Sequence, residues 1–147
     1  MSDLGDMLLT WRKVYGVGHQ ALDAEHQRLV HLINRIYEAE QSSATSLALD
    51  LLKALHLTSM EHFRHENSLM RDIIAGAYQS GVDCKNISEA TVNEHCAEHA
   101  RSLIELENLL QSYGSGQASN VAKHLKDWFV DHATRHDAEL RGFFRPS

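Results

Sequence analysis

The sequence has very little proline and cysteine: one proline, Pro146, and two cysteines, Cys84 and Cys96, among 147 residues. Two cysteines cannot make a disulfide framework, and free thiols are typical of a reducing compartment. No apolar run approaches membrane-spanning length, and the first residues lack the basic and apolar blocks of a signal peptide. We therefore expect a cytoplasmic protein that does not enter a membrane.

Positive charge is also scarce, because 14 Lys and Arg residues stand against 20 Asp and Glu, for a formal net charge of -6. Nucleic acids and anionic membrane surfaces attract basic proteins, so neither is expected as the main partner. The hydrophobic content of 43% is ordinary for a globular protein. A chain of this length is expected to form a single domain, 1–147, with one continuous core.

Apolar residues recur at helical spacing in four segments, and no segment alternates apolar and polar residues as a strand does. The predicted helices span about 21–40, 45–78, 87–113 and 119–138. An irregular arm, 1–20, precedes them, in which Trp11 and Tyr15 are expected to pack against the core. Ser119 or Asn120 is the predicted cap of the last helix. The pattern predicts an all-α, antiparallel four-helix bundle.

The chain contains 11 histidines, and several of them fall on the apolar stripes of the predicted helices. The inward polar residues are His26 on the first helix, His62 and Glu66 on the second, His95 and His99 on the third, and His132 and Asp137 on the fourth. An unpaired buried polar group costs about 1–3 kcal/mol, and metal ligation removes that cost. Seven such ligands suit two carboxylate-bridged ions better than one zinc ion, which takes four. Imidazole with carboxylate favours iron, manganese or zinc, and bundle sites of this type are commonly iron sites.

The spacing of His132 and Asp137 does not suit a regular helix. Five steps of about 100° place their side chains roughly 140° apart, so both cannot face one metal pair. Either a π-type bulge brings Asp137 inward, or His136 is the ligand instead.

Five sequence blocks occur in a fixed order along the chain. They are the arm with Trp11, Tyr15, Gly16 and Gly18; Leu22-Asp23-Ala24-Glu25-His26; His62-Phe63-x-x-Glu66 with Leu69-Met70; His95-x3-His99; and Trp128-Phe129-x-x-His132-x4-Asp137. Together they resemble the bacterial hemerythrins over nearly the whole chain. That family uses His-x4-Asp on its fourth helix, which favours Asp137 over His136.

The resemblance implies a non-haem di-iron centre that binds dioxygen reversibly. One iron would take His95, His99 and His132, the other His26 and His62, with Glu66, Asp137 and an oxo or hydroxo group bridging both. Leu29, Trp128, Phe129 and Ala133 would line an apolar oxygen pocket. The expected role is oxygen carriage or storage and not enzymatic catalysis, which the lack of a further domain after Ser147 favours. The alternatives are an oxygen or redox sensing module of a signalling protein and a di-iron oxidase or peroxidase.

The chain departs from the family pattern in two places. Glu66 and His95 are 29 positions apart, which indicates an insertion over about 74–92. Divided between the second and third helices, it would lengthen each by about two turns and project a tip that could bind a protein partner, as could the C-terminal tail. Ala133 stands where a larger aliphatic residue is expected, so we predict a wider pocket and faster oxidation of the oxygenated form.

Overall fold

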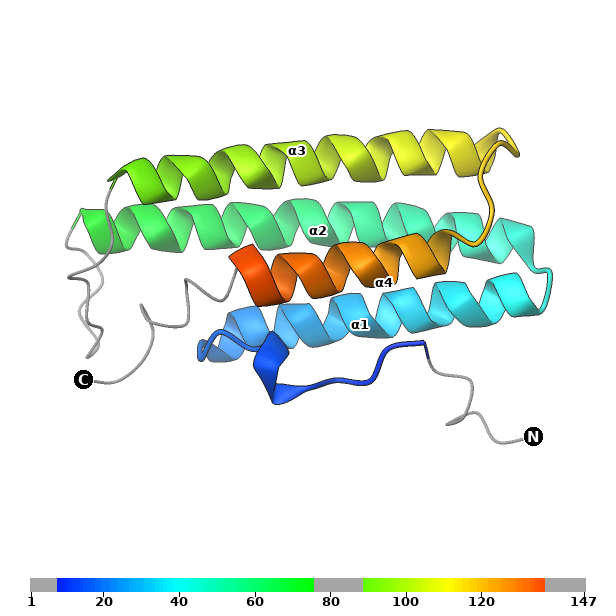
Figure 1. Cartoon of the computed structure of the whole chain (residues 1–147), viewed down its shortest axis with the longest axis horizontal. Coiled ribbons are helices and arrows are strands. Elements are labelled where there is room, and N and C mark those ends of the chain that lie inside the picture. The colour runs from blue at the N-terminus through cyan, green and yellow to red at the C-terminus, as the bar shows by residue number, and fades with distance from the viewer. Residues whose placement is uncertain (1–7, 76–88, 137–147) are drawn as a thin grey trace.

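The computed structural model describes residues 8–75 and 89–136, and these residues form helices and no strand. The α-helices are α1 (Gln20–Gln41), α2 (Thr45–Ile74), α3 (Glu89–Gly114) and α4 (Val121–Asp131). A 3-10 turn, η2 (Lys13–Tyr15), precedes α1, and a π-helical segment, η3 (His132–His136), continues α4. The four α-helices lie side by side, and each runs antiparallel to the next one in the chain (Figure 1). The predicted all-α four-helix bundle is confirmed.

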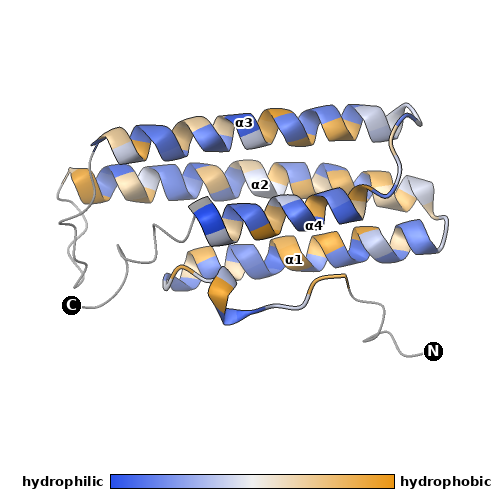
Figure 2. Cartoon of the chain, viewed as in Figure 1, coloured by the Kyte–Doolittle hydropathy of each residue, from blue (hydrophilic) through white to orange (hydrophobic). Residues whose placement is uncertain are grey.

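Each helix is amphipathic, and Figure 2 shows apolar and hydrophilic residues recurring along all four. The apolar side chains meet in one large core to which every helix contributes. Leu29, Ile33, Leu55 and Leu125 are fully buried within it. Burial of these side chains is the main favourable term in forming the bundle, because each gains roughly 1.5–3 kcal/mol on leaving water.

The start of α4 is held by a residue of α1. Both carboxylate oxygens of Glu40 accept hydrogen bonds at 3.0 Å, one from the backbone N–H of Val121 and one from that of Ala122. Asn120 precedes α4 in the left-handed region, with φ 55°, and its side chain makes no capping hydrogen bond. Capping by the side chain of Ser119 or Asn120 was therefore the wrong prediction. A carboxylate from another helix takes that place, where its charge also suits the positive end of the helix dipole.

The N-terminal arm is fixed to α1 by Asn34. Its Oδ1 accepts from the backbone N–H of Leu9 at 2.8 Å, and its Nδ2 donates to the Leu9 carbonyl at 2.7 Å. Further along the arm, Trp11 and Tyr15 pack edge to face with ring centroids 5.8 Å apart, and Tyr15 is buried. Packing of the two aromatic rings on the core agrees with the sequence prediction, whereas the role of Asn34 was not predicted.

Helices α2 and α3 extend past Glu66 and His95 toward one end of the bundle, α2 as far as Ile74 and α3 from Glu89 onward. A second, smaller hydrophobic cluster occupies this end, formed by Val17, Leu22, Met70, Ile73 and Val92. Most of the predicted insertion and all of the C-terminal tail lie outside the described residues, so a protein partner there stays a prediction. Within the part of the chain that the structure describes, no helix has the length and apolarity needed to cross a membrane.

Candidate metal centre

Six of the seven predicted ligands lie within the described residues, and all six are buried, with at most 4% of any of them exposed. They are His26 on α1, His62 and Glu66 on α2, His95 and His99 on α3, and His132 on η3. The seventh, Asp137, lies outside the described residues. Because these positions continue the apolar stripe of each helix, folding of the bundle brings them into its interior together.

The Glu66 carboxylate is central to this group. Its Oε1 lies 3.1 Å from Nε2 of His99, 3.4 Å from Nε2 of His62 and 3.9 Å from Nε2 of His132. One ligand atom from each of four side chains lies within 4.8 Å of the others, and the four are those of His26, His62, Glu66 and His132. The arrangement has the size and the donor types of a cation site.

His95 lies beside this four-residue group and not within it. It is one helical turn before His99 on α3, and the centroids of the two rings are 6.3 Å apart. With 4% of its surface exposed it is nevertheless buried with the rest of the cluster. The cluster therefore extends from His26 on α1 across Glu66 to His95 on α3.

Three of the histidines have their outer ring nitrogen fixed by an acceptor. Nδ1 of His26 donates to the backbone carbonyl of Tyr15 at 2.7 Å, and Nδ1 of His99 donates to Oδ1 of Asn67, also at 2.7 Å. Nδ1 of His62 lies 2.7 Å from Oε1 of Glu25. An imidazole that donates through Nδ1 carries its lone pair on Nε2 in the neutral form, which is the state needed for ligation at Nε2.

None of these three acceptors was predicted as the partner of the histidine that it binds. A backbone carbonyl such as that of Tyr15 leaves no mark in a sequence. Asn67 directly follows Glu66, so it lies off the inward stripe and reaches His99 only because α2 and α3 pack closely. The position of Glu25 in the sequence, directly before His26, suggests His26 as its partner. In the structure Glu25 instead contacts His62 on α2.

Glu25 accepts two hydrogen bonds from α2, since its Oε2 also lies 2.9 Å from Nδ1 of His65. Burial raises the pKa of the Glu25 carboxyl, but the hydrogen bonds and positive potential of His62 and His65 outweigh it, so the net effect lowers that pKa. The carboxylate is therefore ionised at neutral pH and holds both imidazoles by their Nδ1 atoms.

The fourth helix changes from α to π geometry at His132 and keeps it to His136. Thr134 in this segment donates from Oγ1 to the carbonyl of Val130 at 2.6 Å. Hydrogen bonds in a π-helix join residues five apart, so residues at that separation come onto one face. The π geometry that the first of the two alternatives requires is present, and the choice of Asp137 over His136 as the ligand stays a prediction. The placement of the Asp137 side chain lies outside the described residues.

Aromatic rings pack against the histidines of the cluster. Phe63 stacks on His99 with ring centroids 4.3 Å apart and planes 7° from parallel, and Trp128 lies parallel to His132 at 6.0 Å and 8°. Phe129 meets His26 edge to face at 5.6 Å. Of the predicted oxygen-pocket residues, Leu29, Phe129 and Ala133 are fully buried and Trp128 is half-buried. The cluster is thus surrounded by apolar groups that keep water from it.

Comparison with known proteins identifies the kind of domain. The model of the hemerythrin HHE cation binding domain matches residues 17–143. The chain is similar to the bacteriohemerythrin of Pseudomonas aeruginosa, with 25% identity over 130 residues that span 88% of this chain and 77% of that protein. It is also similar to the bacteriohemerythrin of Stenotrophomonas maltophilia, with 21% identity over 136 residues that span 85% of this chain and 89% of that one.

Solved structures share the fold. A crystal structure of hemerythrin with a leucine-to-tyrosine mutation superposes with a TM-score of 0.75 at 20% sequence identity, covering 94% of this chain and 98% of that chain. A crystal structure of a leucine-to-phenylalanine mutant matches with the same TM-score and coverage at 21% identity. These likenesses concern the helical bundle itself.

Proposed function

Because the chain belongs to the hemerythrin family, whose cation binding domain spans residues 17–143, we propose that it binds dioxygen reversibly at two iron ions inside the bundle. In this proposal His95, His99 and His132 would hold one ion and His26 and His62 the other, and Glu66 and Asp137 would be ligands shared by both. The observation that carries the proposal is the fully buried carboxylate of Glu66, which has three imidazole Nε2 atoms within 3.9 Å.

The chemistry of the donor atoms fits bound cations. Because His62 and His99 donate from Nδ1, their Nε2 atoms carry lone pairs when the rings are neutral. Those lone pairs face the Glu66 carboxylate at 3.4 Å and 3.1 Å, so acceptor would meet acceptor in a buried place. A buried carboxylate also costs several kcal/mol unless a positive charge compensates it. Cations between these atoms satisfy the imidazoles and the carboxylate together.

The ligand types support dioxygen binding over oxidation chemistry. Bundle sites that carry out oxidations are rich in carboxylates with Glu-x-x-His pairs, whereas five of the seven proposed ligands here are histidines. Two ferrous ions held by these residues would supply the electrons that dioxygen takes up on binding, and would recover them on its release. The protein contributes a dry site, because Leu29, Phe129 and Ala133 are fully buried beside the histidines.

Exposure of the anaerobically reduced protein to air tests the proposal. We expect a visible absorption band that appears with oxygen and disappears under vacuum over repeated cycles. Elemental analysis of freshly isolated protein is expected to give about two iron ions per chain, the number that carboxylate-bridged bundle sites hold. An immediate and irreversible ferric spectrum would overturn the carrier function, and zinc as the sole metal would overturn the assignment of iron.

A further inference from the structure

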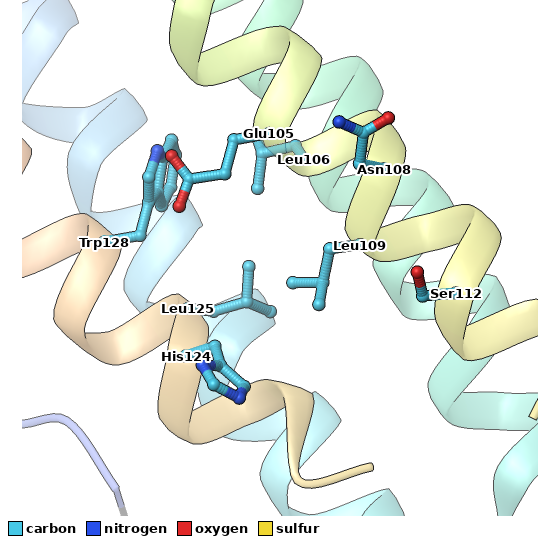
Figure 3. A pocket seen from close by; sticks show the side chains of 8 residues that line it. All are labelled: Glu105, Leu106, Asn108, Leu109, Ser112, His124, Leu125 and Trp128. Carbon is cyan, nitrogen blue, oxygen red and sulfur yellow. The ribbon is translucent and has the colours of Figure 1, made fainter. Parts of the chain in front are cut away.

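The ring of His26 depends on the N-terminal arm, whereas that of His132 packs on its own helix. Trp128 of α4 lies parallel to His132 and also lines the groove between α3 and α4 (Figure 3). His26 instead donates from Nδ1 to the backbone carbonyl of Tyr15 in the arm, at 2.7 Å. A backbone carbonyl fixes a ligand ring only when the chain that carries it is itself held in place. The residues that hold this part of the arm therefore affect the candidate metal centre.

A turn of the backbone orders the arm before that carbonyl. The N–H of Tyr15 donates to the carbonyl of Arg12 at 2.9 Å, and the N–H of Gly16 donates to that of Lys13 at 3.0 Å. The Tyr15 ring is buried and meets Phe129 edge to face, with ring centroids 5.4 Å apart. These contacts hold Tyr15 from the side that precedes its carbonyl.

Asp23 of α1 holds the arm on the other side of the carbonyl. Its Oδ1 accepts from the backbone N–H of Val17 at 2.6 Å, and its Oδ2 accepts from that of Gly18 at 3.3 Å. Gly16 packs directly on the same carboxylate, because a Cβ added there would lie 3.1 Å from Oδ2. Glycine also suits position 18, where φ is 86°. One carboxylate thus contacts all three residues that follow Tyr15.

From these contacts we infer that Asp23 is a positioning residue of the candidate metal centre. It lies one helical turn before His26 on α1, so both side chains face the arm. Asp23 fixes the chain that follows Tyr15, and the Tyr15 carbonyl fixes the Nδ1 proton of His26. The lone pair of the neutral ring then lies on Nε2, the atom that a cation would bind. Asp23 thereby acts on the centre through the main chain of the arm.

Exchange of the His26 ring proton with water tests this role directly. In the full-length protein as isolated, NMR of nitrogen-labelled histidine rings identifies the Nδ1 proton of His26 by its absence in His26→Ala. We expect it to exchange about tenfold faster in Asp23→Ala, which is the effect of losing one ordinary hydrogen bond. Asp23→Asn keeps one acceptor oxygen, so its exchange should be intermediate, and it provides the test if Asp23→Ala does not fold. Native exchange in the Asp23 variants would overturn the inference.

Asn34→Ala is the matched control, because Asn34 also joins α1 to the arm by two hydrogen bonds, but at Leu9 and not beside Tyr15. This variant should leave the exchange of the His26 proton unchanged. In competition with a chromophoric chelator, Asp23→Ala should weaken metal binding about tenfold, the lower end of the effect of a partner behind a ligating histidine. Asn34→Ala should bind metal like the native protein. Equal changes in the two variants would indicate a general loosening of the arm and would overturn the inference.

The effect of Asp23 on metal binding rests on the proposed function, because it assumes that a cation binds His26, whereas its effect on the His26 proton does not. Zinc as the sole metal, or an irreversible reaction with oxygen, would overturn the carrier proposal, and faster proton exchange in Asp23→Ala would still support the role of Asp23. Native exchange and native metal affinity in Asp23→Ala would overturn that role and leave the carrier proposal standing.

Discussion

Oε1 of Glu25 lies 2.7 Å from Nδ1 of His62, so a carboxylate on α1 fixes the ring of a buried histidine on α2. Its other oxygen accepts from His65, which is 37% exposed. The contact decides which nitrogen of His62 carries the proton and which faces Glu66. It also joins two helices next to the candidate metal centre, so its loss should be visible in metal affinity.

We expect Glu25→Ala to weaken metal binding about 10- to 100-fold, because removal of an acceptor behind a ligating histidine has effects of this size. Glu25→Gln keeps one acceptor oxygen and should lose less metal affinity than Glu25→Ala. Competition with a chromophoric chelator measures both variants. Glu38→Ala, which changes an exposed acid on the same helix, is the control. Equal affinity in the native protein and Glu25→Ala would show that the contact does not support the site.

Glu66→Ala should remove the bridging carboxylate and empty the site of metal. His65→Ala, at the neighbouring position, should leave two metal ions in place, because His65 points to Glu25 and not to Glu66. Elemental analysis of the two purified variants compares them directly. Loss of metal from His65→Ala as complete as that from Glu66→Ala would mean that the assignment of inward residues on α2 is wrong.

Ala133 is fully buried in the π-helical segment directly after His132. We expect Ala133→Leu to narrow the predicted oxygen pocket and to lengthen the life of the oxygenated form, which is followed as the decay of its visible band in air. Inserting three carbon atoms into a packed interior should also cost about 1–3 kcal/mol of stability. Equal or slower decay in the native protein would contradict the prediction that Ala133 widens the pocket.

The hydrogen bonds of Glu40 to the start of α4 should stabilise the bundle, because they satisfy two backbone donors that the helix cannot pair itself. Glu40→Ala is expected to lower the free energy of unfolding by about 1–2 kcal/mol, the usual range for loss of a helix cap. Urea denaturation measures this change. Glu107→Ala, an exposed acid of α3, should stay within about 0.5 kcal/mol of the native protein.

Tyr113 gives a prediction for alkaline solution. Burial raises the pKa of its phenol, and the negative charge of Glu40 raises it further. The folded chain therefore keeps this proton to a higher pH than the unfolded chain, whose tyrosine pKa is about 10. The protonated Tyr113 phenol therefore contributes fully to the free energy of unfolding below about pH 10. This contribution is lost as the pH rises through the pKa that Tyr113 has in the folded chain.

Tyr113→Phe should remove this part of the alkaline loss of stability. The measurement is the difference in the free energy of unfolding between about pH 8 and about pH 11, which should be smaller in the variant than in the native protein. Tyr37→Phe, a change at a half-buried tyrosine of α1, is the control. If the difference in the free energy of unfolding between the two pH values is the same in Tyr113→Phe and in the native protein, the Tyr113 phenol does not contribute to the alkaline loss of stability.

The parts of the fold that follow from local periodicity could be predicted. Stripes such as Leu22, His26, Leu29 and Ile33 repeat over many turns, and side chains on one face of a helix must be buried together. The same periodicity located the polar residues that now cluster around Glu66. It also exposed the conflict at His132, because the five-residue spacing to Asp137 cannot be met by a regular helix.

The contacts between distant polar groups could not be predicted in the same way. Asn34 binds the backbone of Leu9, and Glu40 binds that of Val121, and in each case the partner is a main-chain group that every residue possesses. Glu25 lies next to His26 in the sequence, but its carboxylate accepts a hydrogen bond from His62 on another helix. Such pairings depend on how helices are rotated and shifted against each other, which side-chain spacing within one helix does not encode.

The bond between Glu40 and Val121 also orders events during synthesis. The two residues are 81 positions apart, so the bond cannot form until both have left the ribosome. A ribosome delivers α1, α2 and α3 before the segment that this carboxylate caps exists. His132 therefore joins the other buried histidines only after the last helix has emerged and docked. A nascent chain shorter than this would hold an incomplete set of ligands open to the wrong metal.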